Sequence, residues 1–576
     1  MTDVSFKIGG EAGQGLQAIG YSLAKAFAKG GLHVFANQDN ESRIRGGHNF
    51  FQIRVSDRPV QAVSDKIHVL VSLDKASVEA HQGELVEDGV ILIDAGSLGA
   101  PAGRSFVDIP FDKIAKEETG LGIAANSVAA GAALSVVGYD LALLEEVLEE
   151  AFKRKGSEVV EKNIRAAQAG YRYVLRNLCR GFRYMVEAGE RPRGRLLLTG
   201  NEAVAAAALI SGCRFMSGYP MSPSTPIQQF FAARMGEYPV VFEQAEDEIA
   251  AINMALGASF AGARSMVATS GGGFSLMVEG LSLAGMTESP IVIVLAQRPG
   301  PATGFPTRTE QAELEFAIHA GHGEFPRAVF APGTPEQAFH LTFKAFNLAE
   351  RYQIPVIILS DQHLADSYYT VERFETSHLS VDRGGLLAEW DPDARGEYRR
   401  HEATQSGVSP RLIPGAKGGL VVTDSDEHTE DGHITERADV RSRNVEKRMK
   451  VLELVRREIS PPVLYGPADA EAVLVGWGST YGALREAVDS LNRESGRAAM
   501  LHFSEVWPFP TEAAAGLLGS GKRLVAVEGN AQGQMARLIR AETGVKIPYR
   551  VLRYDGRPLT PGYILEKVRA LGELGW

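Results

Sequence analysis

Residues 241–277 have the sequence VFEQAEDEIAAINMALGASFAGARSMVATSGGGFSLM, and the fold of the chain can be worked out from this stretch. Two apolar residues precede an acidic run, and a helical pattern of small residues follows. A short apolar run, typical of a strand, then ends in Gly271-Gly272-Gly273. Carboxylates at the start of a helix, beside a glycine-rich turn after a strand, are typical of a cofactor site at the ends of a parallel sheet. The alternative is that the acidic residues only stabilise the helix dipole.

The composition indicates a large α/β protein. At 576 residues the chain is too long for one hydrophobic core, and its 44% hydrophobic and 23% charged residues are ordinary for a globular protein. A net charge of -11 without a basic stripe argues against a nucleic-acid partner. The two cysteines, Cys179 and Cys213, exclude a disulfide framework and an iron–sulfur cluster held by this chain alone. With neither a signal-peptide pattern nor a long apolar run, we expect a cytoplasmic protein without a membrane segment.

Strand and helix patterns alternate along the chain and predict three doubly wound α/β domains. We assign these domains to residues 1–180, 195–368 and 461–576. Residues 369–460 differ because they are polar and rich in glycine, proline and charge, with DSDEHTEDGH at their centre. That spacing of acidic residues and histidines matches neither a calcium nor a zinc motif, so we expect a solvated connector.

The first domain carries two candidate anion-binding loops. The strand VSFKI leads into GGEAGQG, where Gly13 and Gly15 could admit a phosphate to the start of the next helix or only permit a tight turn. This spacing is not the dinucleotide fingerprint. In ESRIRGGH, Arg43 and Arg45 beside Gly46 could form an anion site, although arginines on a solvated loop are commoner.

The second domain has its polar residues where strands end. Three prolines in GYPMSPSTP fix a loop that presents Tyr219, Pro220 and Ser222, which favours a site over a simple turn. Arg298 directly follows a buried strand and suits a carboxylate because its planar fork gives two parallel hydrogen bonds.

In these motifs the chain resembles the α subunit of 2-oxoacid:ferredoxin oxidoreductases with a γ domain fused at the N-terminus, and it is most similar to 2-oxoglutarate synthases. GGEAGQG with ESRIRGGH resembles the γ domain. GYPMSPST, QAEDEIAAINMALGAS, TSGGGFSLM and AQRPGPATGFPTRTEQ resemble the domain that covers the thiamine aminopyrimidine. VGWGSTYG with EGNAQGQ resembles the transketolase C-terminal-like domain. The resemblance covers nearly the whole chain.

The resemblance implies roles for single residues. Glu246 corresponds to the glutamate that hydrogen-bonds the N1′ atom of thiamine diphosphate and promotes its imino tautomer. Glu243, Asp247 and Glu248 are then expected to be dipole, solvent or interface charges. The resemblance further implies a set of contact residues: Ser222 and Tyr219 near the substrate, Arg298 at the 2-oxoacid carboxylate, Arg308 at a distal carboxylate, Pro220, Gly271 and Gly272 at the cofactor, and Gly13, Gly15, Arg43, Arg45 and Gly46 at coenzyme A or an interface.

The resemblance also implies a partner, because the chain lacks the Gly-Asp-Gly motif that holds Mg²⁺ and the diphosphate. A β subunit would supply these and a [4Fe–4S] cluster, in an (αβ)₂ heterotetramer that reduces ferredoxin, and this chain alone would be inactive. The implied reaction is the reversible, coenzyme A-dependent oxidative decarboxylation of 2-oxoglutarate to succinyl-CoA and CO₂, which the reductive TCA cycle runs backwards.

Three alternatives stay open. The same chemistry could act on pyruvate, a branched-chain 2-oxoacid or indolepyruvate. The N-terminal glycine loop could instead serve a dinucleotide-dependent oxidoreductase, against which the missing G-x-G-x-x-G counts. The chain could also be a non-catalytic scaffolding subunit.

Overall fold

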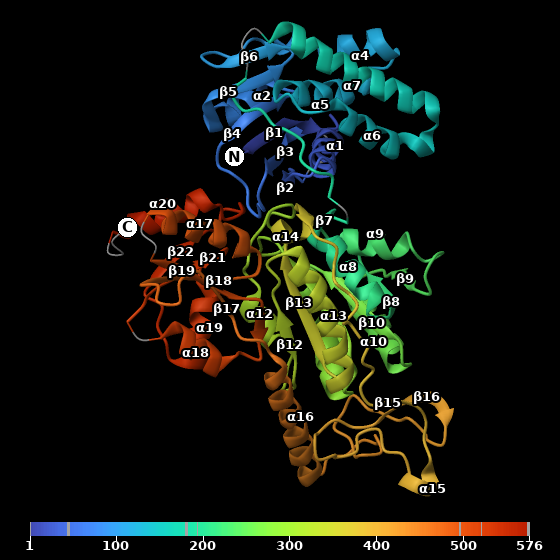
Figure 1. Ribbon diagram of the computed structural model, residues 1–576. Helices are drawn as coiled ribbons and strands as arrows, with labels where there is room; N and C mark the ends of the chain where they lie inside the picture. The colour runs from blue at the N-terminus through green and yellow to red at the C-terminus, as the bar shows by residue number, and fades with distance from the viewer. Residues whose placement is uncertain are drawn as a thin grey trace. The chain divides into compact units, whose positions relative to one another are not determined.

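The computed structural model describes residues 2–42, 46–178, 182–192, 194–494, 497–519 and 521–572 (Figure 1). The chain divides into two compact units. Unit 1 comprises residues 1–199, 366–373 and 560–563, and unit 2 comprises residues 200–365, 374–559 and 564–576. Cys179 lies outside the described residues, whereas Cys213 is a buried free thiol.

Unit 1 is built on an eight-stranded mixed sheet with the order β6-β5-β4-β1-β3-β2-β14-β7. Strand β1 is parallel to β4 and antiparallel to β3, which lies between β1 and β2. The strands are β1 (Asp3–Ala12), β2 (His33–Asp39), β3 (Gly46–Ser56), β4 (Ile67–Ser72), β5 (Leu85–Ile93), β6 (Ser105–Asp108), β7 (Leu196–Thr199) and β14 (Tyr368–Val371). The helices are α1 (Leu16–Lys29), α2 (Lys75–His81), α3 (Ala95–Leu98), α4 (Phe111–Thr119), α5 (Ala125–Val136), α6 (Leu141–Phe152) and α7 (Ser157–Asn177).

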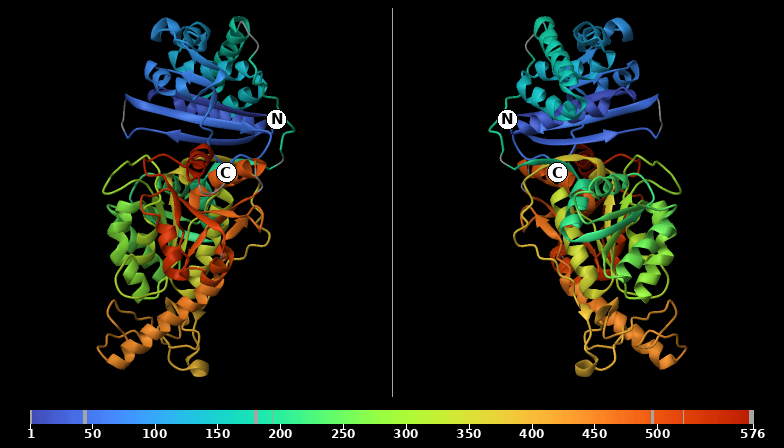
Figure 2. Two further views of the ribbon diagram at one scale, coloured as in Figure 1. Left: turned by 90° about the vertical axis from the view of Figure 1, so that its left-hand side faces the viewer. Right: turned by 90° about the vertical axis from the view of Figure 1, so that its right-hand side faces the viewer.

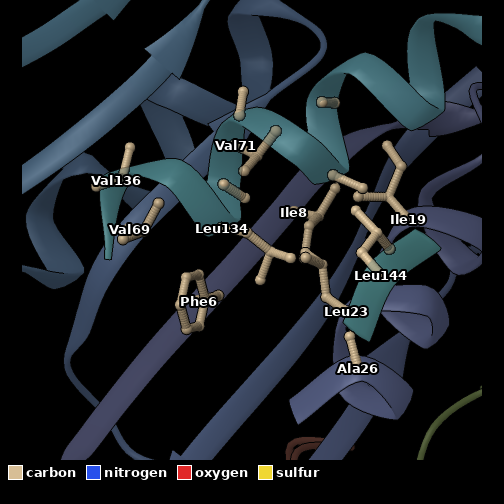
Figure 3. Close-up of a cluster of buried hydrophobic side chains, with 14 of the residues drawn as sticks. Phe6, Ile8, Ile19, Leu23, Ala26, Val69, Val71, Leu134, Val136 and Leu144 are labelled. Atoms are coloured by element: carbon tan, nitrogen blue, oxygen red, sulfur yellow. The ribbon is translucent and has the colours of Figure 1, made fainter. Parts of the chain in front are cut away.

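The main core of unit 1 lies between this sheet and the helices α1 and α4–α7. Figure 3 shows Phe6, Ile8 and Val69 on neighbouring strands facing Leu134 and Leu144 from the helices. Alternate residues of β1 are apolar and buried, as the pattern of its sequence predicts. The opposite face of the sheet carries a smaller cluster beneath α2 and α3. Burial on both faces fixes the strand register that positions the glycine loop after β1.

Two strands of this sheet correct the predicted domain boundary. The second domain was expected to begin with the strand at residues 196–198, but β7 pairs with β14 in the sheet of unit 1. Strand β14 also pairs with β2. These two edge strands come from sequence that flanks the second domain, so periodicity alone could not assign them to a sheet.

Unit 2 contains a seven-stranded sheet with the order β20-β12-β13-β11-β10-β8-β9, parallel except for β20. Figure 2 shows helices on both faces of its strands. The strands are β8 (Cys213–Gly218), β9 (Val241–Gln244), β10 (Arg264–Thr269), β11 (Ile291–Gln297), β12 (Ala328–Phe330), β13 (Pro355–Asp361) and β20 (Glu505–Trp507). The helices are α8 (Gly200–Ile210), α9 (Thr225–Ala232), α10 (Glu248–Phe260), α11 (Gly271–Met286), α12 (Leu314–His319), α13 (Pro335–Tyr352) and α14 (Gln362–Asp366).

A five-stranded sheet, β17-β19-β18-β21-β22, completes the α/β fold of the C-terminal part. Its elements are β17 (Val463–Tyr465), β18 (Ala472–Trp477), α17 (Tyr481–Glu494), β19 (Ala498–Phe503), α18 (Thr511–Leu518), β21 (Arg523–Glu528), α19 (Gln534–Thr543), β22 (Tyr549–Leu552) and α20 (Pro561–Ala570). The predicted fold class, α/β with several doubly wound sheets, is confirmed.

The connector is ordered, which corrects the expectation of a solvated segment. It contains β15 (Leu386–Glu389), α15 (Pro392–Arg395) and β16 (Arg411–Lys417), and it leads into α16 (Ala438–Glu458). Its His428 is 1% exposed and lies against the ring of His401 at 3.8 Å. Glu427 pairs with Arg441 at 2.6 Å. Charged residues at this density therefore form internal ion pairs that a composition argument does not detect.

Among the described residues, no single helix is both long and apolar enough to cross a bilayer. One bent pair, Phe111–Thr119 with Gly122–Val136, meets the criteria of length and composition only, and most of its second helix lies in the core of unit 1.

Candidate functional site

Six strands of the seven-stranded sheet are parallel, so their carboxyl ends share one edge, and four of them lead into the predicted motifs. Neighbouring strand ends lie side by side in the register, with Gln297 opposite Asp361 and Gly218 opposite Gln244. The segments that follow these strands are the Tyr219 loop, the acidic run, the glycine triplet and the Arg298 loop. The sheet thus brings together the motifs that are far apart in the sequence.

The acidic run divides into residues with different environments. Glu243 and Glu246 are exposed, and Glu246 lies in a bend before helix α10. Asp247 is the N-cap of α10, and its side chain accepts a hydrogen bond from the amide of Ala250 at 2.7 Å. Glu248, the first residue of α10, is only 4% exposed, so it is not a solvent charge, although its place in the first turn still fits a dipole charge.

Glu248 points into the sheet edge. Its Oε1 atom is buried and has no hydrogen-bond partner among the described residues. A Cβ atom on Gly273 would lie 2.7 Å from this Oε1 and 2.1 Å from Oγ1 of Thr269. The third glycine of the triplet therefore makes room for the carboxyl group. A buried, unpartnered carboxyl oxygen is costly in a folded protein and is characteristic of a binding site.

The Tyr219 loop is held by hydrogen bonds to its backbone. The carbonyl of Tyr219 accepts from Gln228 Nε2 at 3.1 Å, and that of Pro223 accepts from Asn201 Nδ2 at 2.8 Å. The Ser222 carbonyl accepts from Arg298 Nη1 at 2.8 Å. Tyr219, Pro220 and Ser222 are exposed, so a rigid backbone presents them at the sheet edge.

Arg298 lies between carboxyl groups. Burial lowers the pKa of its guanidinium, and the nearby Glu313 and then Glu248 act in the opposite direction. Its Nη1 atom donates a hydrogen bond to the Ser222 carbonyl, which leaves the other N–H groups of the guanidinium for a ligand. The structure thus brings Ser222, Arg298 and Glu248 together, with Glu246 on the exposed side.

Glu313 was not anticipated from the sequence. Its backbone N–H donates to Gln297 Oε1 at 3.0 Å. A Cβ atom on Gly271 would lie 2.5 Å from Oε1 of Glu313. Burial raises the pKa of its carboxyl group to about 8, with Glu310 adding to the effect. It is therefore protonated at neutral pH.

Arg308 lies on the same loop, farther from the strand. Burial and the neighbouring charge of Arg557 lower its pKa to about 10, so it stays cationic. The next residue, Thr309, lies with its hydroxyl 3.4 Å from Asp361 Oδ1. Two arginines near each other give this part of the loop a positive charge.

The glycine-rich strand ends of the C-terminal sheet hold this loop in place. Gln311 Nε2 donates to the carbonyl of Trp477 at 3.0 Å, and its Oε1 accepts from the amide of Gly529 at 2.9 Å. Gln534 Nε2 donates to the carbonyl of Ala312 at 2.7 Å. The motifs VGWGSTYG and EGNAQGQ therefore contact this loop within the same chain.

Unit 1 has a separate pocket of about 590 Å³ at its glycine loop. Gly13 and Gln14 line it together with Asn126 and Asp94. Gly15 packs so closely on Asn126 that a Cβ would lie 1.9 Å from Nδ2. Gly46 begins β3 and is not among the residues that line the pocket. Arg43 and Arg45 lie outside the described residues.

A helical periodicity could have identified Glu248. The buried residues of α10 include Ala251, Ile252 and Ala255, which follow Glu248 by three, four and seven positions. Glu248 is therefore on the inward stripe of its own helix, whereas Glu246 precedes the helix. No comparable pattern marks Glu313, whose burial depends on the loop contacts with the C-terminal sheet.

Three family models match successive parts of the chain. Residues 206–447 match the pyruvate flavodoxin/ferredoxin oxidoreductase, thiamine diP-bdg model. Residues 5–173 match pyruvate ferredoxin/flavodoxin oxidoreductase, and residues 470–564 match pyruvate:ferredoxin oxidoreductase core domain II.

Curated relatives cover the chain almost end to end. The 2-oxoacid:ferredoxin oxidoreductase subunit alpha from Sulfolobus sp is 34% identical over 96% of this chain and 95% of its own length. The 2-oxoglutarate oxidoreductase subunit KorA from Mycobacterium tuberculosis is 28% identical over 94% and 87%. Among solved structures, a 2-oxoglutarate:ferredoxin oxidoreductase from Magnetococcus marinus, with 2-oxoglutarate, coenzyme A and succinyl-CoA bound, matches with a TM-score of 0.92, 31% identity and 99% coverage of both chains.

Proposed function

This chain belongs to the α subunits of the 2-oxoacid:ferredoxin oxidoreductases, and on that premise we propose that it forms the aminopyrimidine half of a thiamine diphosphate site. With a β subunit, it would catalyse the coenzyme A-dependent oxidative decarboxylation of 2-oxoglutarate, reversibly and with ferredoxin as electron acceptor. The observation that carries the proposal is the buried Glu248 Oε1 at the glycine triplet, to which none of the described residues donates a hydrogen bond.

Glu248, rather than Glu246, is our candidate for the carboxylate that binds the cofactor. A protonated ring nitrogen of an aminopyrimidine is a donor that satisfies a buried carboxylate oxygen. When bound, thiamine diphosphate supplies the nucleophile and the electron sink for decarboxylation. The role of Glu248 is to accept a hydrogen bond from the protonated pyrimidine nitrogen. This bond keeps the proton on that nitrogen. The open space beside Gly272 fits a close approach of the ring.

Arg298 is the candidate for the 2-oxoacid carboxylate. Its bond to the Ser222 carbonyl fixes one end of the guanidinium, and a fixed fork pairs well with a planar carboxylate. The charge of Arg308 and Arg557 beyond it would suit a second, distal carboxylate. A dicarboxylate such as 2-oxoglutarate uses both cations, whereas pyruvate, a branched-chain 2-oxoacid or indolepyruvate would leave the second cation unused.

The second half of the site would come from a β subunit that supplies Mg²⁺, the diphosphate contacts and a [4Fe–4S] cluster. Exposed apolar side chains at the sheet edge and on α10 and α11 support such a contact: Tyr219, Ile249, Met254 and Leu276 are 40 to 48% exposed. Neighbouring apolar residues on a soluble surface favour a protein interface. We propose that this surface binds the β subunit, in an (αβ)₂ assembly in the cytoplasm.

Coenzyme A is assigned to the pocket of unit 1. Gly13 and Gln14 follow the end of β1, and Gly15 precedes helix α1 in a left-handed conformation with φ of 79°. A loop of this kind admits phosphates to backbone amides. Asn126 from the facing helix adds an amide for the same ligand.

The test is turnover by the chain co-expressed with its β subunit. Viologen reduction would be measured with a panel of 2-oxoacids, with and without thiamine diphosphate and coenzyme A. We expect 2-oxoglutarate to give the highest kcat/KM, with a strict need for both additions. Highest activity on a monocarboxylate would overturn the substrate assignment, and activity of the β subunit alone would support a scaffolding role. Nicotinamide-dependent turnover by the isolated chain would favour the dinucleotide alternative.

A further inference from the structure

Glu313 is a half-buried residue with a buried carboxyl oxygen, and the proposed chemistry does not use it. Its Oε2 is buried and accepts no hydrogen bond from the described residues. Its Oε1 lies against the backbone of Gly271, the first residue of α11. The backbone of Glu313 is fixed to Gln297, and Gln297 Nε2 is bonded to the Ser360 carbonyl at 3.1 Å. The backbone that carries the carboxyl group is thus fixed, while no described residue donates a hydrogen bond to its Oε2 atom.

The charged groups around Glu313 are mostly of its own sign. Glu310 and Asp361 are the neighbouring carboxyl groups, and Arg298 is the neighbouring cation. Glu248 also acts on the charge of this guanidinium, more weakly than Glu313. Arg298 is half-buried, and this single arginine does not offset the burial that raises the pKa of both Glu313 and Asp361.

Whether the positive charge of Arg298 can attract a ligand depends on which neighbouring carboxyl group is neutral. If Glu313 were ionised, Arg298 would already be neutralised before a substrate arrived, and the incoming carboxylate would be repelled. A protonated Glu313 leaves that positive charge for the ligand. The group cannot serve as an ordinary salt-bridge partner, because its Oε2 makes no hydrogen bond to a described residue.

Resting on the proposed function, we propose that Glu313 is a positioning residue that stays protonated during turnover and thereby reserves Arg298 for the substrate carboxylate. It acts through Arg298 and need not touch the reacting atoms. The pKa of about 8, raised by burial and by Glu310, agrees with this arrangement. Above that pH the group ionises, and the affinity for the 2-oxoacid should fall.

The experiment measures kcat and KM for the 2-oxoacid from pH 6.5 to 9.5 in the αβ complex. For the wild type we expect KM to rise about tenfold between pH 7 and pH 9, because with a pKa of about 8 only about a tenth of the complex keeps Glu313 protonated at pH 9. Glu313→Gln carries a neutral amide of the same size, so its KM should stay within about twofold across this range while kcat changes little. Glu315→Gln is the matched control, because Glu315 is two residues away and pairs with Arg537 at the surface. It should keep the wild-type profile.

A second measurement needs no variant. Binding of N-oxalylglycine, an unreactive analogue of 2-oxoglutarate, to the wild-type complex is followed by calorimetry in buffers of different ionisation heat. We expect the uptake of about one proton at pH 9 and almost none at pH 7.

The outcomes separate this inference from the proposed function. If the complex turns over 2-oxoacids but Glu313→Gln keeps the alkaline rise in KM, or if no proton is taken up at pH 9, the role of Glu313 is refuted and the function stands. If the wild-type complex does not turn over any 2-oxoacid, the proposed function fails.

Discussion

The glycine triplet at the start of α11 allows a stability prediction in which adjacent positions give opposite results. In Gly273→Ala the new Cβ lies 2.1 Å from Thr269 Oγ1 and 2.7 Å from Glu248 Oε1. Thr269 is fully buried and cannot move aside freely. In Gly272→Ala the methyl group enters open space, with no described atom within 4 Å. The two variants make the same chemical change in the same helical turn.

The expected free energies follow from these contacts. Replacing a helical glycine by alanine gains about 0.5–1 kcal/mol, so Gly272→Ala should stabilise α11 by that amount. Overpacking costs about 1–3 kcal/mol, so Gly273→Ala should destabilise it by roughly 1 kcal/mol after the same gain. We therefore expect the two variants to differ by about 2 kcal/mol.

Hydrogen exchange at the amides of α11 is the suitable assay, because a chain with two compact units has no single unfolding temperature. Equal protection in the two variants would refute the crowding argument. Turnover adds a second readout. Since we place the cofactor ring beside Gly272, Gly272→Ala should lower kcat/KM even though it stabilises the helix, and unchanged turnover would contradict that placement.

Other predictions concern the connector and the clamped loop. Glu288→Gln should destabilise unit 2 by about 3–5 kcal/mol, because it removes the carboxylate 2.6 Å from the buried Lys447 Nζ. Denaturant unfolding measures this, with Glu430→Gln as control because Glu430 is only half-buried and pairs with the exposed Arg399. Although burial acts against it, hydrogen bonds from arginines of α16 lower the pKa of Glu427 to about 2. Because its pKa is lowered, Glu427 stabilises the fold above the ordinary value of 4.5, and this contribution is lost as the pH falls toward 2. Amide hydrogen exchange of the connector, measured at falling pH, checks this. Gln311→Ala removes two bonds that hold the Arg298 loop and should raise the KM for the 2-oxoacid several-fold, with steady-state kinetics as the check.

The sequence predicts most of the fold because its strands are strongly patterned. The buried strands β11 and β13 are continuous apolar runs that end at polar residues, as expected for a parallel sheet. The edge strands β7 and β14 are only four residues long, and their partners lie elsewhere in the chain. Their sheet therefore depends on tertiary contacts that a local pattern does not contain.

The structure brings several of the predicted site residues together, while their roles stay predictions. The carboxyl ends of the strands bring Ser222, Arg298 and the glycine triplet together, as parallel-sheet geometry requires. The choice of Glu246 over Glu248 depended on motif likeness, whereas burial depends on the phase of α10. Glu313 could not be found in this way, because its environment is created by a loop clamped from the C-terminal sheet.

The most direct test of the account compares Glu248→Gln with Glu246→Gln in the complex with the β subunit. Each change replaces a carboxylate by an amide of the same size, two residues apart. We expect Glu248→Gln to lower kcat by about 100-fold or more and to weaken thiamine diphosphate binding, measured by calorimetry, without lowering stability. Glu246→Gln should retain turnover within about twofold of the wild type. Full activity of Glu248→Gln, or its loss in Glu246→Gln, would contradict the assignment.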